Sequence, residues 1–448
     1  MIERDILERL VKWKTKSDRK PLLVFGARQV GKTWVLKAFG EKEFEHCAYF
    51  SFDENKDIGE LFLRTKDPKR IVEQLSFLTD VPISPHSTLI IFDEIQECPQ
   101  AIESLKYFCE KTPEYAVACA GSLLGLMLSH EGFSFPVGKV DHINMYPVSF
   151  SEFLKTRNRQ LFDYYASIED FDPIPEIFFN LLSEAFSAYR VCGGMPEAAM
   201  AMIEGNVGTV DEKLSNILKD YALDFIKHTT PIFANRISHI WQSIPSQLSK
   251  ENRKFIYQTV RPGARAREYE DALIWLENAG LIHRVSLCRE PSLPLKSYED
   301  LNIFKIYGND IGLLRVQANL PPGIFHRSDN NYKEFKGALA ENYILQSLLY
   351  QYGQGLCYWS SGNQAEVDFL LQTGTSVIPI EVKSGTSIRG KSLIEYGKKY
   401  SPKLRLRYSM QNLKYDGNLL NMPLFLADRT SELIDKLPSF HSDLQQRQ

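Results

Sequence analysis

The stretch LLVFGARQVGKTW, residues 22–34, sets the architecture of this chain. It joins an apolar run to a glycine, four further residues and then Gly31-Lys32-Thr33. Glycines at these places let the backbone turn so that its N–H groups point at phosphate oxygens, while the lysine reaches the terminal phosphates and the threonine hydroxyl can ligate Mg2+. A glycine-rich turn with an exposed lysine is the alternative. We predict a phosphate-binding loop whose nucleotide ligands are Gly26, Gln29, Val30, Gly31, Lys32 and Thr33.

The residues on either side of this loop support the prediction. The apolar run at residues 22–25 is typical of a buried strand, and residues 34–39 continue as a helix that Gly40 is expected to end. A strand, a phosphate-binding loop and a helix in this order are the context that the loop requires.

A second buried strand is expected to complete the nucleotide site. Residues 88–92 are mostly apolar and are followed by Asp93-Glu94, as in the central strand of a parallel sheet. Asp93 would hold Mg2+ beside Thr33, and Glu94 would polarise the attacking water as a general base. An ordinary strand end is the alternative, but its place downstream of the loop favours the catalytic interpretation.

Further strands and helices alternate around these two. Residues 48–52 and 115–120 read as strands, and residues 71–78 as a helix. Ser122 follows the later strand, where its hydroxyl could sense the terminal phosphate; a plain Gly-Ser turn is equally compatible. The alternation predicts an α/β fold, a parallel sheet with helices on both faces and ligands at the carboxyl ends of its strands.

Several quoted motifs together resemble a known family. They are GARQVGKT at 26–33, FDEIQ at 92–96, AGS at 120–122, YPVSFSEF at 146–153 and GGMPEA at 193–198. In this order they are similar to prokaryotic AAA-type P-loop ATPases that carry a C-terminal domain of unknown function related to the PD-(D/E)XK nucleases. The resemblance implies ATP as the nucleotide. Many relatives have Gly-Arg where this chain has Gly138-Lys139, and a lysine cannot offer the planar fork of an arginine.

The domain organisation combines this resemblance with the residue pattern. Residues 151–228 are helical in pattern, with Gly193-Gly194 as the one sharp break expected, and the resemblance implies a helical lid. Amphipathic helices at 237–244 and 269–276, followed by a strand at 280–285, suit a winged helix. We expect a parallel-sheet P-loop ATPase domain at 1–150, a helical lid at 151–232, a winged-helix-like domain at 233–320 and a C-terminal α/β restriction-endonuclease-like domain at 321–448.

A basic cluster precedes the second of these amphipathic helices. Arg261, Arg265 and Arg267 could meet the phosphates of DNA or RNA, or one of them could reach a neighbouring copy's nucleotide. A solvated loop is the alternative. Since winged helices also dock proteins, the cluster leaves open a nucleic acid, a protein partner or a homo-oligomer.

A second candidate site lies in the stretch AEVDFLLQTGTSVIPIEVKSG, residues 365–385. Two alternating apolar runs flank Gly374-Thr375, which predicts a hairpin with a two-residue turn. In that register Asp368 faces Glu381 and Glu366 faces Lys383 on one face of the hairpin. Opposed carboxylates repel, so we expect a cation between them, with Mg2+ as the natural candidate. Lys383 would then orient or activate a metal-bound water.

This pattern resembles the PD-(D/E)XK nuclease core, in which an upstream helix adds a glutamate. Glu341, within GALAENYI at 337–344, occupies the matching position. The resemblance therefore implies Glu341, Asp368 and Glu381 as metal ligands and Lys383 as a catalytic residue. A solvated hairpin edge of alternating charge is the alternative.

Composition bounds these hypotheses. The 448 residues have a net charge of −3, which argues against a nucleic-acid footprint over the whole surface. The apolar runs are far shorter than the roughly 20 residues of a membrane span, and no signal peptide is apparent, so we expect a cytoplasmic protein without a membrane partner. Seven cysteines without a C-x-x-C pair read as reduced thiols.

Two functions follow, both requiring ATP and Mg2+. In one, an ATPase controls a C-terminal metal-dependent nuclease. In the other, an ATP-dependent switch or scaffold has a C-terminal domain that binds nucleic acid or protein without cleaving it. A nucleotide-binding protein with no linked output is hard to distinguish from the second.

Overall fold

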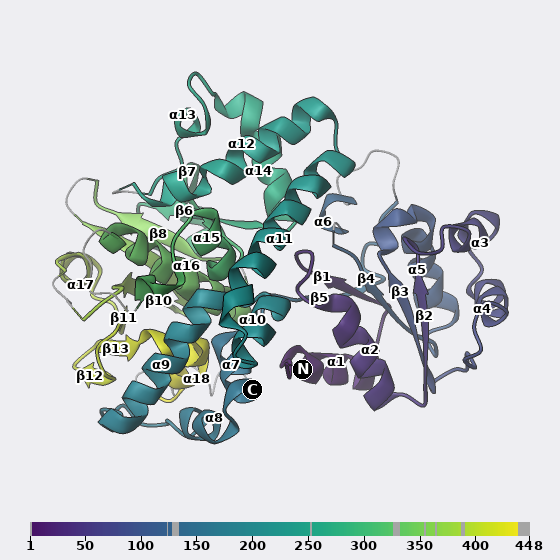
Figure 1. Ribbon diagram of the computed structural model, residues 1–448, viewed down its shortest axis with the longest axis horizontal. Coiled ribbons are helices and arrows are strands. Elements are labelled where there is room, and N and C mark those ends of the chain that lie inside the picture. The colour runs from purple at the N-terminus through teal and green to yellow at the C-terminus, as the bar shows by residue number, and fades with distance from the viewer. Residues whose placement is uncertain are drawn as a thin grey trace. The chain divides into compact units, whose positions relative to one another are not determined.

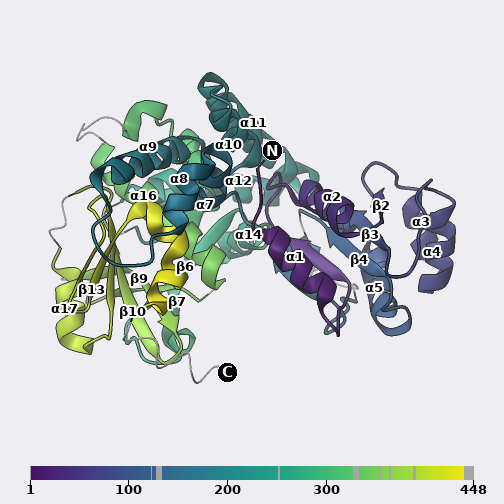
Figure 2. The same cartoon turned by 90° about the horizontal axis from the view of Figure 1, so that it is seen from below.

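The computed structural model in Figures 1 and 2 describes residues 2–122, 124–127, 134–250, 253–325, 332–353, 355–362, 365–386 and 390–437. The chain divides into two compact units. The first unit contains residues 3–146 and 274–281, and the second contains residues 147–273 and the chain from residue 282 onward. Each unit is described separately.

The first unit is built on a five-stranded parallel sheet in the order β2-β3-β4-β1-β5. The parallel sheet predicted from the alternation of strands and helices is thereby confirmed. Its strands are β1 (Leu22–Phe25), β2 (His46–Ser51), β3 (Thr88–Asp93), β4 (Ala116–Ala120) and β5 (Asp141–Asn144).

Helices cover both faces of this sheet. Alternate residues of β3 point to opposite faces, so Ile90 and Phe92 pack into a core with α3, α4 and α5, while Leu89 lies beside Gly40 of α2. Burial on both faces explains why β3 is a nearly continuous apolar run. The helices are α1 (Ile6–Thr15), α2 (Lys32–Glu43), α3 (Ile58–Arg64), α4 (Pro68–Ser76), α5 (Pro99–Lys111) and the short α6 (Leu124–Met127).

Gly40 does not end α2, contrary to the sequence-based prediction. The helix runs on to Glu43 and stops at Phe44, whose backbone is extended. A Cβ at Gly40 would lie 2.5 Å from the Cys47 sulfur of β2. The glycine therefore permits close packing of helix on sheet, which outweighs its weak helix propensity.

The second unit contains the helical stretch predicted after residue 150. Gly193-Gly194 is not its only break: Asn158 caps α8 by accepting a hydrogen bond from the Leu161 N–H at 3.0 Å, and Pro175 precedes α9. The helices of this stretch are α7 (Phe150–Arg157), α8 (Arg159–Ala166), α9 (Glu176–Cys192), α10 (Pro196–Ile203) and α11 (Val207–Lys227).

Among the residues that the structure describes, seven further α-helices follow α11. The last residues of α14 belong to the first unit, and the others lie in the second. They are α12 (Pro231–Leu248), α13 (Tyr257–Val260), α14 (Ala266–Asn278), α15 (Ile311–Gln317), α16 (Lys333–Tyr352), α17 (Ser392–Tyr400) and α18 (Thr430–Asp435).

The second unit also holds a mixed eight-stranded sheet in the order β12-β13-β11-β10-β9-β8-β6-β7. The strand expected after residue 280 is β6, and it forms an antiparallel pair with β7. Because β6 also pairs in parallel with β8, this pair continues the C-terminal sheet and is not a free wing. The strands are β6 (Ile282–Cys288), β7 (Glu299–Gly308), β8 (Cys357–Ser360), β9 (Glu366–Thr373), β10 (Ser376–Val382), β11 (Arg405–Ser409), β12 (Lys414–Asp416) and β13 (Leu419–Pro423).

Strands on both sides of residue 320 therefore share one sheet. The helical stretch is tied to the same unit, since the Ser151 N–H donates to Asp428 at 2.9 Å and Asn412 bonds Ile174. The boundaries expected at residues 232 and 320, the lid and the winged helix stay predictions.

Candidate functional site

The phosphate-binding loop lies between β1 and α2, as predicted. Gly26 and Gly31 have φ values of 149° and 96°, in the region that favours glycine. A Cβ at Gly26 would lie 2.2 Å from the Met145 carbonyl oxygen, so a larger residue would displace the loop. Gln29 also has a positive φ, of 65°. This chain of turns is what exposes successive N–H groups at the start of a helix.

Lys32 is buried at the start of α2. Its ammonium donates hydrogen bonds to the carbonyl oxygens of Gly26 at 2.9 Å and Ala27 at 2.8 Å. Burial lowers the pKa of Lys32 to about 8, although the charges of Glu94 and Asp93 oppose this change. A buried cation whose hydrogen-bond acceptors among the described residues are carbonyl oxygens is a strong binding group for an anion.

Thr33 and Asp93 meet at the carboxyl end of β3. The Thr33 hydroxyl donates to Asp93 Oδ2 at 2.8 Å, and the Tyr49 hydroxyl donates to the same oxygen at 2.8 Å. A hydroxyl and a carboxylate side by side are oxygen ligands that fit Mg2+, which takes few protein ligands and keeps several waters. Tyr49 of β2 was not predicted from sequence as a site residue. It could have been found from its position, because it lies two residues before Ser51, which pairs with Asp93 in the sheet.

Glu94 and Ser122 are also brought together. The Ser122 hydroxyl donates to Glu94 Oε2 at 3.2 Å, and the Gln96 amide donates to the same oxygen at 2.5 Å. Glu94 has a φ of 47°, so the chain turns sharply directly after β3. Ser122 thus lies at the edge of the sheet where it was expected, beside the predicted general base. Gln96, part of the quoted FDEIQ motif, was not given a role from sequence.

A segment from the middle of the chain also belongs to the first unit. A Cβ at Gly280 would lie 3.3 Å from the Ala27 nitrogen, so this glycine closely approaches the phosphate-binding loop. Asn278 lies against α6, since a Cβ at Gly125 would lie 2.3 Å from the Asn278 carbonyl oxygen. The sequence did not predict this contact, because nothing local marks residues 274–281 as neighbours of the phosphate-binding loop.

The other basic residues considered from sequence are exposed or paired. Lys139 forms an ion pair with Glu110 of α5 at 2.8 Å. The arginines before and at the start of α14 have exposed side chains, and they are Arg261, Arg265 and Arg267. Exposed guanidinium groups are compatible with both a solvated loop and a phosphate contact.

The C-terminal hairpin has the register that its two-residue turn predicts, with Ser376 opposite Thr373 and Ile380 opposite Phe369. Glu381, at the end of β10, is buried and accepts a hydrogen bond from Arg407 Nε at 3.0 Å. The Lys383 ammonium lies 3.2 Å from Glu381 Oε1, but no described residue donates a hydrogen bond to that oxygen.

The remaining charges of this region have other partners. Asp368 accepts a hydrogen bond from the Val382 N–H at 2.7 Å. Glu366 pairs with Lys305 of β7 at 2.5 Å, and not with Lys383. Buried Glu341 bonds Arg253 and accepts from the Tyr307 hydroxyl at 3.2 Å.

The C-terminal metal site stays a prediction, and its carboxylates already have partners within the protein. Within the part of the chain that the structure describes, no group of three His, Cys, Asp or Glu side chains is close enough to hold one. Arginines neutralise two of the three carboxylates: Arg253 pairs with Glu341, and Arg407 with Glu381. For Glu341 and Glu381 the neutralising cation is thus supplied by the protein.

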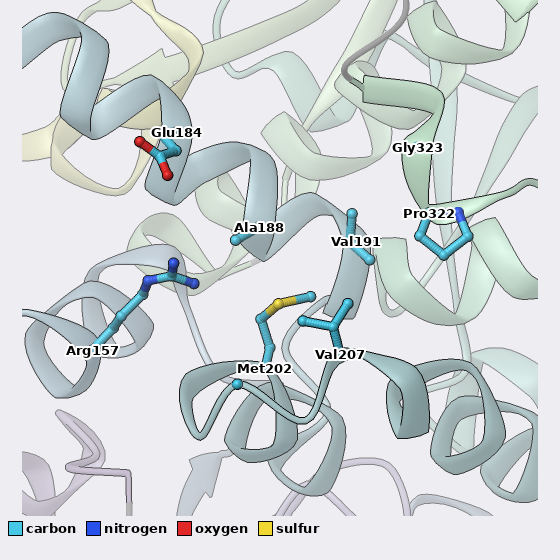
Figure 3. Close-up of a pocket in the computed structure, with 9 residues that line it drawn as sticks. Arg157, Glu184, Ala188, Val191, Met202, Val207, Pro322 and Gly323 are labelled. Atoms are coloured by element: carbon cyan, nitrogen blue, oxygen red, sulfur yellow. The ribbon is translucent and has the colours of Figure 1, made fainter.

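A cavity of about 370 Å³ lies elsewhere in the second unit (Figure 3). Apolar side chains from α9 and from the start of α11 face it, among them Val191 and Val207, with Glu184 and Arg157 at its border (Figure 3). None of the site residues predicted from sequence lines it.

Three family models match successive parts of the chain. Residues 18–154 match an AAA domain, while residues 183–323 and 336–425 match two domains of unknown function (DUF8612 and DUF4143). A search of curated proteins found no match. Among the described helices, none combines the length and hydropathy of a membrane span.

Solved structures show more distant likenesses. A Walker-type ATPase of Pyrococcus abyssi has 16% identity and a TM-score of 0.44, over 71% of this chain and 96% of that one. The Orc1 protein of Aeropyrum pernix in complex with DNA has 14% identity and a TM-score of 0.28, over 71% and 93%. The Thermotoga maritima RuvB branch migration motor has 13% identity and a TM-score of 0.29, over 65% and 90%. These scores carry no conclusion about function.

The conclusion rests instead on the family match and the site. The match at residues 18–154 includes the phosphate-binding loop, Asp93 and Ser122, all at one edge of a parallel sheet. This part of the chain is therefore an AAA-type P-loop ATPase domain.

Proposed function

We propose that this protein binds ATP with Mg2+ and hydrolyses it at Lys32, Thr33, Asp93, Glu94 and Ser122, and that the cycle acts as a switch on the second unit. The observation that carries the proposal is the meeting of Thr33 with Asp93, and of Glu94 with Ser122, beside a buried Lys32. The matched AAA domain supports ATP in preference to other nucleotides, because the loop itself reads phosphates.

Each residue of the proposed site has its own role in ATP binding or hydrolysis. N–H groups of the loop, from Gly26 to Thr33, hold the phosphates, and Lys32 exchanges its two carbonyl acceptors for phosphate oxygens. Bound Mg2+, held by Thr33 and Asp93, would neutralise the charge that develops on the phosphates. Glu94 accepts a proton from the attacking water, and Ser122 fixes the carboxylate that does so.

The polypeptide chain itself connects the nucleotide site in the first unit to the second unit. Residues 274–281 share the first unit with the loop, and Gly280 closely approaches Ala27. These residues end and follow α14, whose earlier turns belong to the second unit. A rearrangement of the loop around phosphate can therefore reach the second unit along one helix.

A metal-dependent nuclease under ATP control is the second candidate. The register of β9 and β10 supports it, because the resemblance to PD-(D/E)XK nucleases implies a site at Asp368, Glu381 and Lys383, on and directly after these strands. The arginine partners of Glu341 and Glu381 weigh against it. We favour a second unit that binds its partner without cleavage. DNA or RNA is the partner that suits the exposed side chains of Arg261, Arg265 and Arg267. A protein or further copies of the chain are the other partners to test. We propose the cytoplasm as the place where the protein acts.

The ATPase proposal is tested by steady-state hydrolysis with and without Mg2+. We expect Mg2+-dependent ATP hydrolysis by the intact chain. Lys32→Ala should weaken ATP binding at least about tenfold, because a charge-assisted hydrogen bond to phosphate is lost. The control is Lys42→Ala, in the last turn of the same helix. Equal activity in the Lys32 and Lys42 variants would refute the assignment.

The pH dependence of kcat/KM in the same hydrolysis assay provides a second test. The value of kcat/KM reports the free enzyme, in which the pKa of Lys32 is lowered to about 8 by burial. The ammonium that binds phosphate is present below this pH and is lost above it. We therefore expect kcat/KM to fall as pH rises through about 8, and Lys32→Arg to lack this fall because arginine stays charged.

The nuclease candidate is tested with single-stranded DNA, duplex DNA and RNA, each with Mg2+ and with or without ATP. We expect no cleavage above that of Asp368→Ala, because two of the three predicted metal ligands, Glu341 and Glu381, are paired with arginines. Cleavage that Asp368→Ala loses while keeping ATP hydrolysis would contradict this and establish the nuclease.

A further inference from the structure

We infer that Gln96 is a positioning residue for hydrolysis: its side-chain amide fixes Glu94 so that one carboxylate oxygen is left to face the attacking water. The inference rests on the proposed function, in which Glu94 is the general base. It adds a residue to which neither the phosphate-loop pattern nor the family match assigns a role.

The first observation is how the Glu94 carboxylate is held. Gln96 Nε2 donates to Glu94 Oε2 at 2.5 Å, and the Ser122 hydroxyl donates to the same oxygen at 3.2 Å. Both donors act on Oε2, so Oε1 keeps its lone pairs for a further donor such as water. Two donors on one oxygen also restrict rotation of the carboxyl group. The pair of contacts therefore defines which oxygen serves as base.

The second observation is how Gln96 itself is held. It lies in the short 3-10 turn from Ile95 to Glu97, which directly follows the left-handed backbone of Glu94. This turn brings the side chains of residues 94 and 96 to the same side. Gln96 Oε1 is buried, and no described residue donates a hydrogen bond to it. A buried acceptor without a donor is costly, and such groups persist where another role requires them.

The third observation is the space that Gln96 needs. A Cβ at Gly121 would lie 2.2 Å from Gln96 Oε1. Gly121 immediately precedes Ser122, so the missing side chain lets the amide lie between the end of β3 and the end of β4. With Oε1 facing Gly121, the amide nitrogen faces the carboxylate; the opposite orientation would set two acceptors against each other. The surroundings thus select the donating orientation.

The test is a set of variants in the intact chain, compared in kcat, KM and affinity for a non-hydrolysable ATP analogue. Gln96→Met keeps the length of the side chain and removes the donor. We expect kcat to fall about tenfold, as for loss of orientation of a general base, with KM and analogue affinity within about twofold. An unchanged kcat, or a loss confined to KM and analogue affinity, would overturn the inference.

Gly121→Ala provides an independent variant. It should lower kcat in the wild-type background by displacing the amide, and it should have little further effect in Gln96→Ala, where the space is vacated. An equal loss in both backgrounds would mean that the methyl group acts through Leu124, its other close neighbour, and would count against Gln96.

The thermal midpoint of each variant separates misfolding from misorientation. A fall in kcat with an unchanged midpoint and unchanged analogue affinity supports the positioning role, whereas a fall that parallels the midpoint overturns it. The proposed function and the role of Gln96 are refuted by different results. A wild-type chain without ATP hydrolysis would refute the proposed function, while normal hydrolysis in both the wild type and Gln96→Met would refute only the role of Gln96.

Discussion

Glu94→Gln is expected to bind ATP as tightly as the wild-type protein and to hydrolyse it at least about 100-fold more slowly. The amide has the shape of the carboxylate but cannot take a proton from water. Since Lys32, Thr33 and the loop N–H groups hold the phosphates, binding should be spared. The measurement is kcat in a steady-state assay beside equilibrium binding of ATP in the variant.

Glu97→Gln is the matched control for this prediction. It makes the same chemical change three residues further along the chain, at an exposed position beyond the site. We expect its kcat to equal that of the wild type. If Glu94→Gln kept most of its activity, Glu94 would not be the base, and the interpretation of Ser122 and Gln96 as its partners would fail as well.

Arg407→Met is expected to lower the free energy of unfolding by about 3–5 kcal/mol. Glu381 is only 1% exposed, and Arg407 is its one hydrogen-bond donor among the described side chains. Removing the guanidinium leaves the buried Glu381 carboxylate with only the partly exposed Lys383 ammonium beside it. Leaving one member of a buried pair uncompensated costs more than the pair contributed. Urea unfolding, followed by fluorescence, measures the change.

Two further variants test whether the loss of stability comes from an unpaired buried charge. Arg407→Met combined with Glu381→Gln should recover much of the lost stability, because no buried charge is left unpaired. Lys414→Met breaks a pair with Asp416 in which both side chains are largely exposed, and it should cost less than about 1 kcal/mol. A small effect of Arg407→Met, together with stabilisation of the wild type by Mg2+ that depends on Asp368, would instead indicate a metal between the carboxylates.

The parts that were predictable from sequence depend on short-range geometry. The phosphate-binding loop needs a glycine, four residues and Gly31-Lys32, and any chain with this spacing between a strand and a helix can form the same turn. The hairpin register follows from the two-residue turn at Gly374-Thr375, because side chains alternate along a strand and a turn of set length aligns the two arms. Each of these two features depends only on residues that are close together in the chain.

Other features could not be predicted in this way. Gly40 reads as a helix end but serves close packing on Cys47, and nothing in the sequence of β6 shows that it pairs with β8. In both cases the partner comes from a different element. A local pattern states what a segment can form, and tertiary packing selects among those forms.

The two candidate sites illustrate the same division. Strand ends of a parallel sheet meet at one edge, so Asp93 and Ser122 could be assigned to one site from their places after apolar runs. In the C-terminal region the carboxylates were visible in the sequence, but their arginine partners were not, since Arg407 is 26 residues from Glu381 and Arg253 is 88 residues from Glu341. A charge pattern along the chain shows which groups need neutralising, and whether a metal or an arginine does so depends on which distant side chain the fold buries beside them.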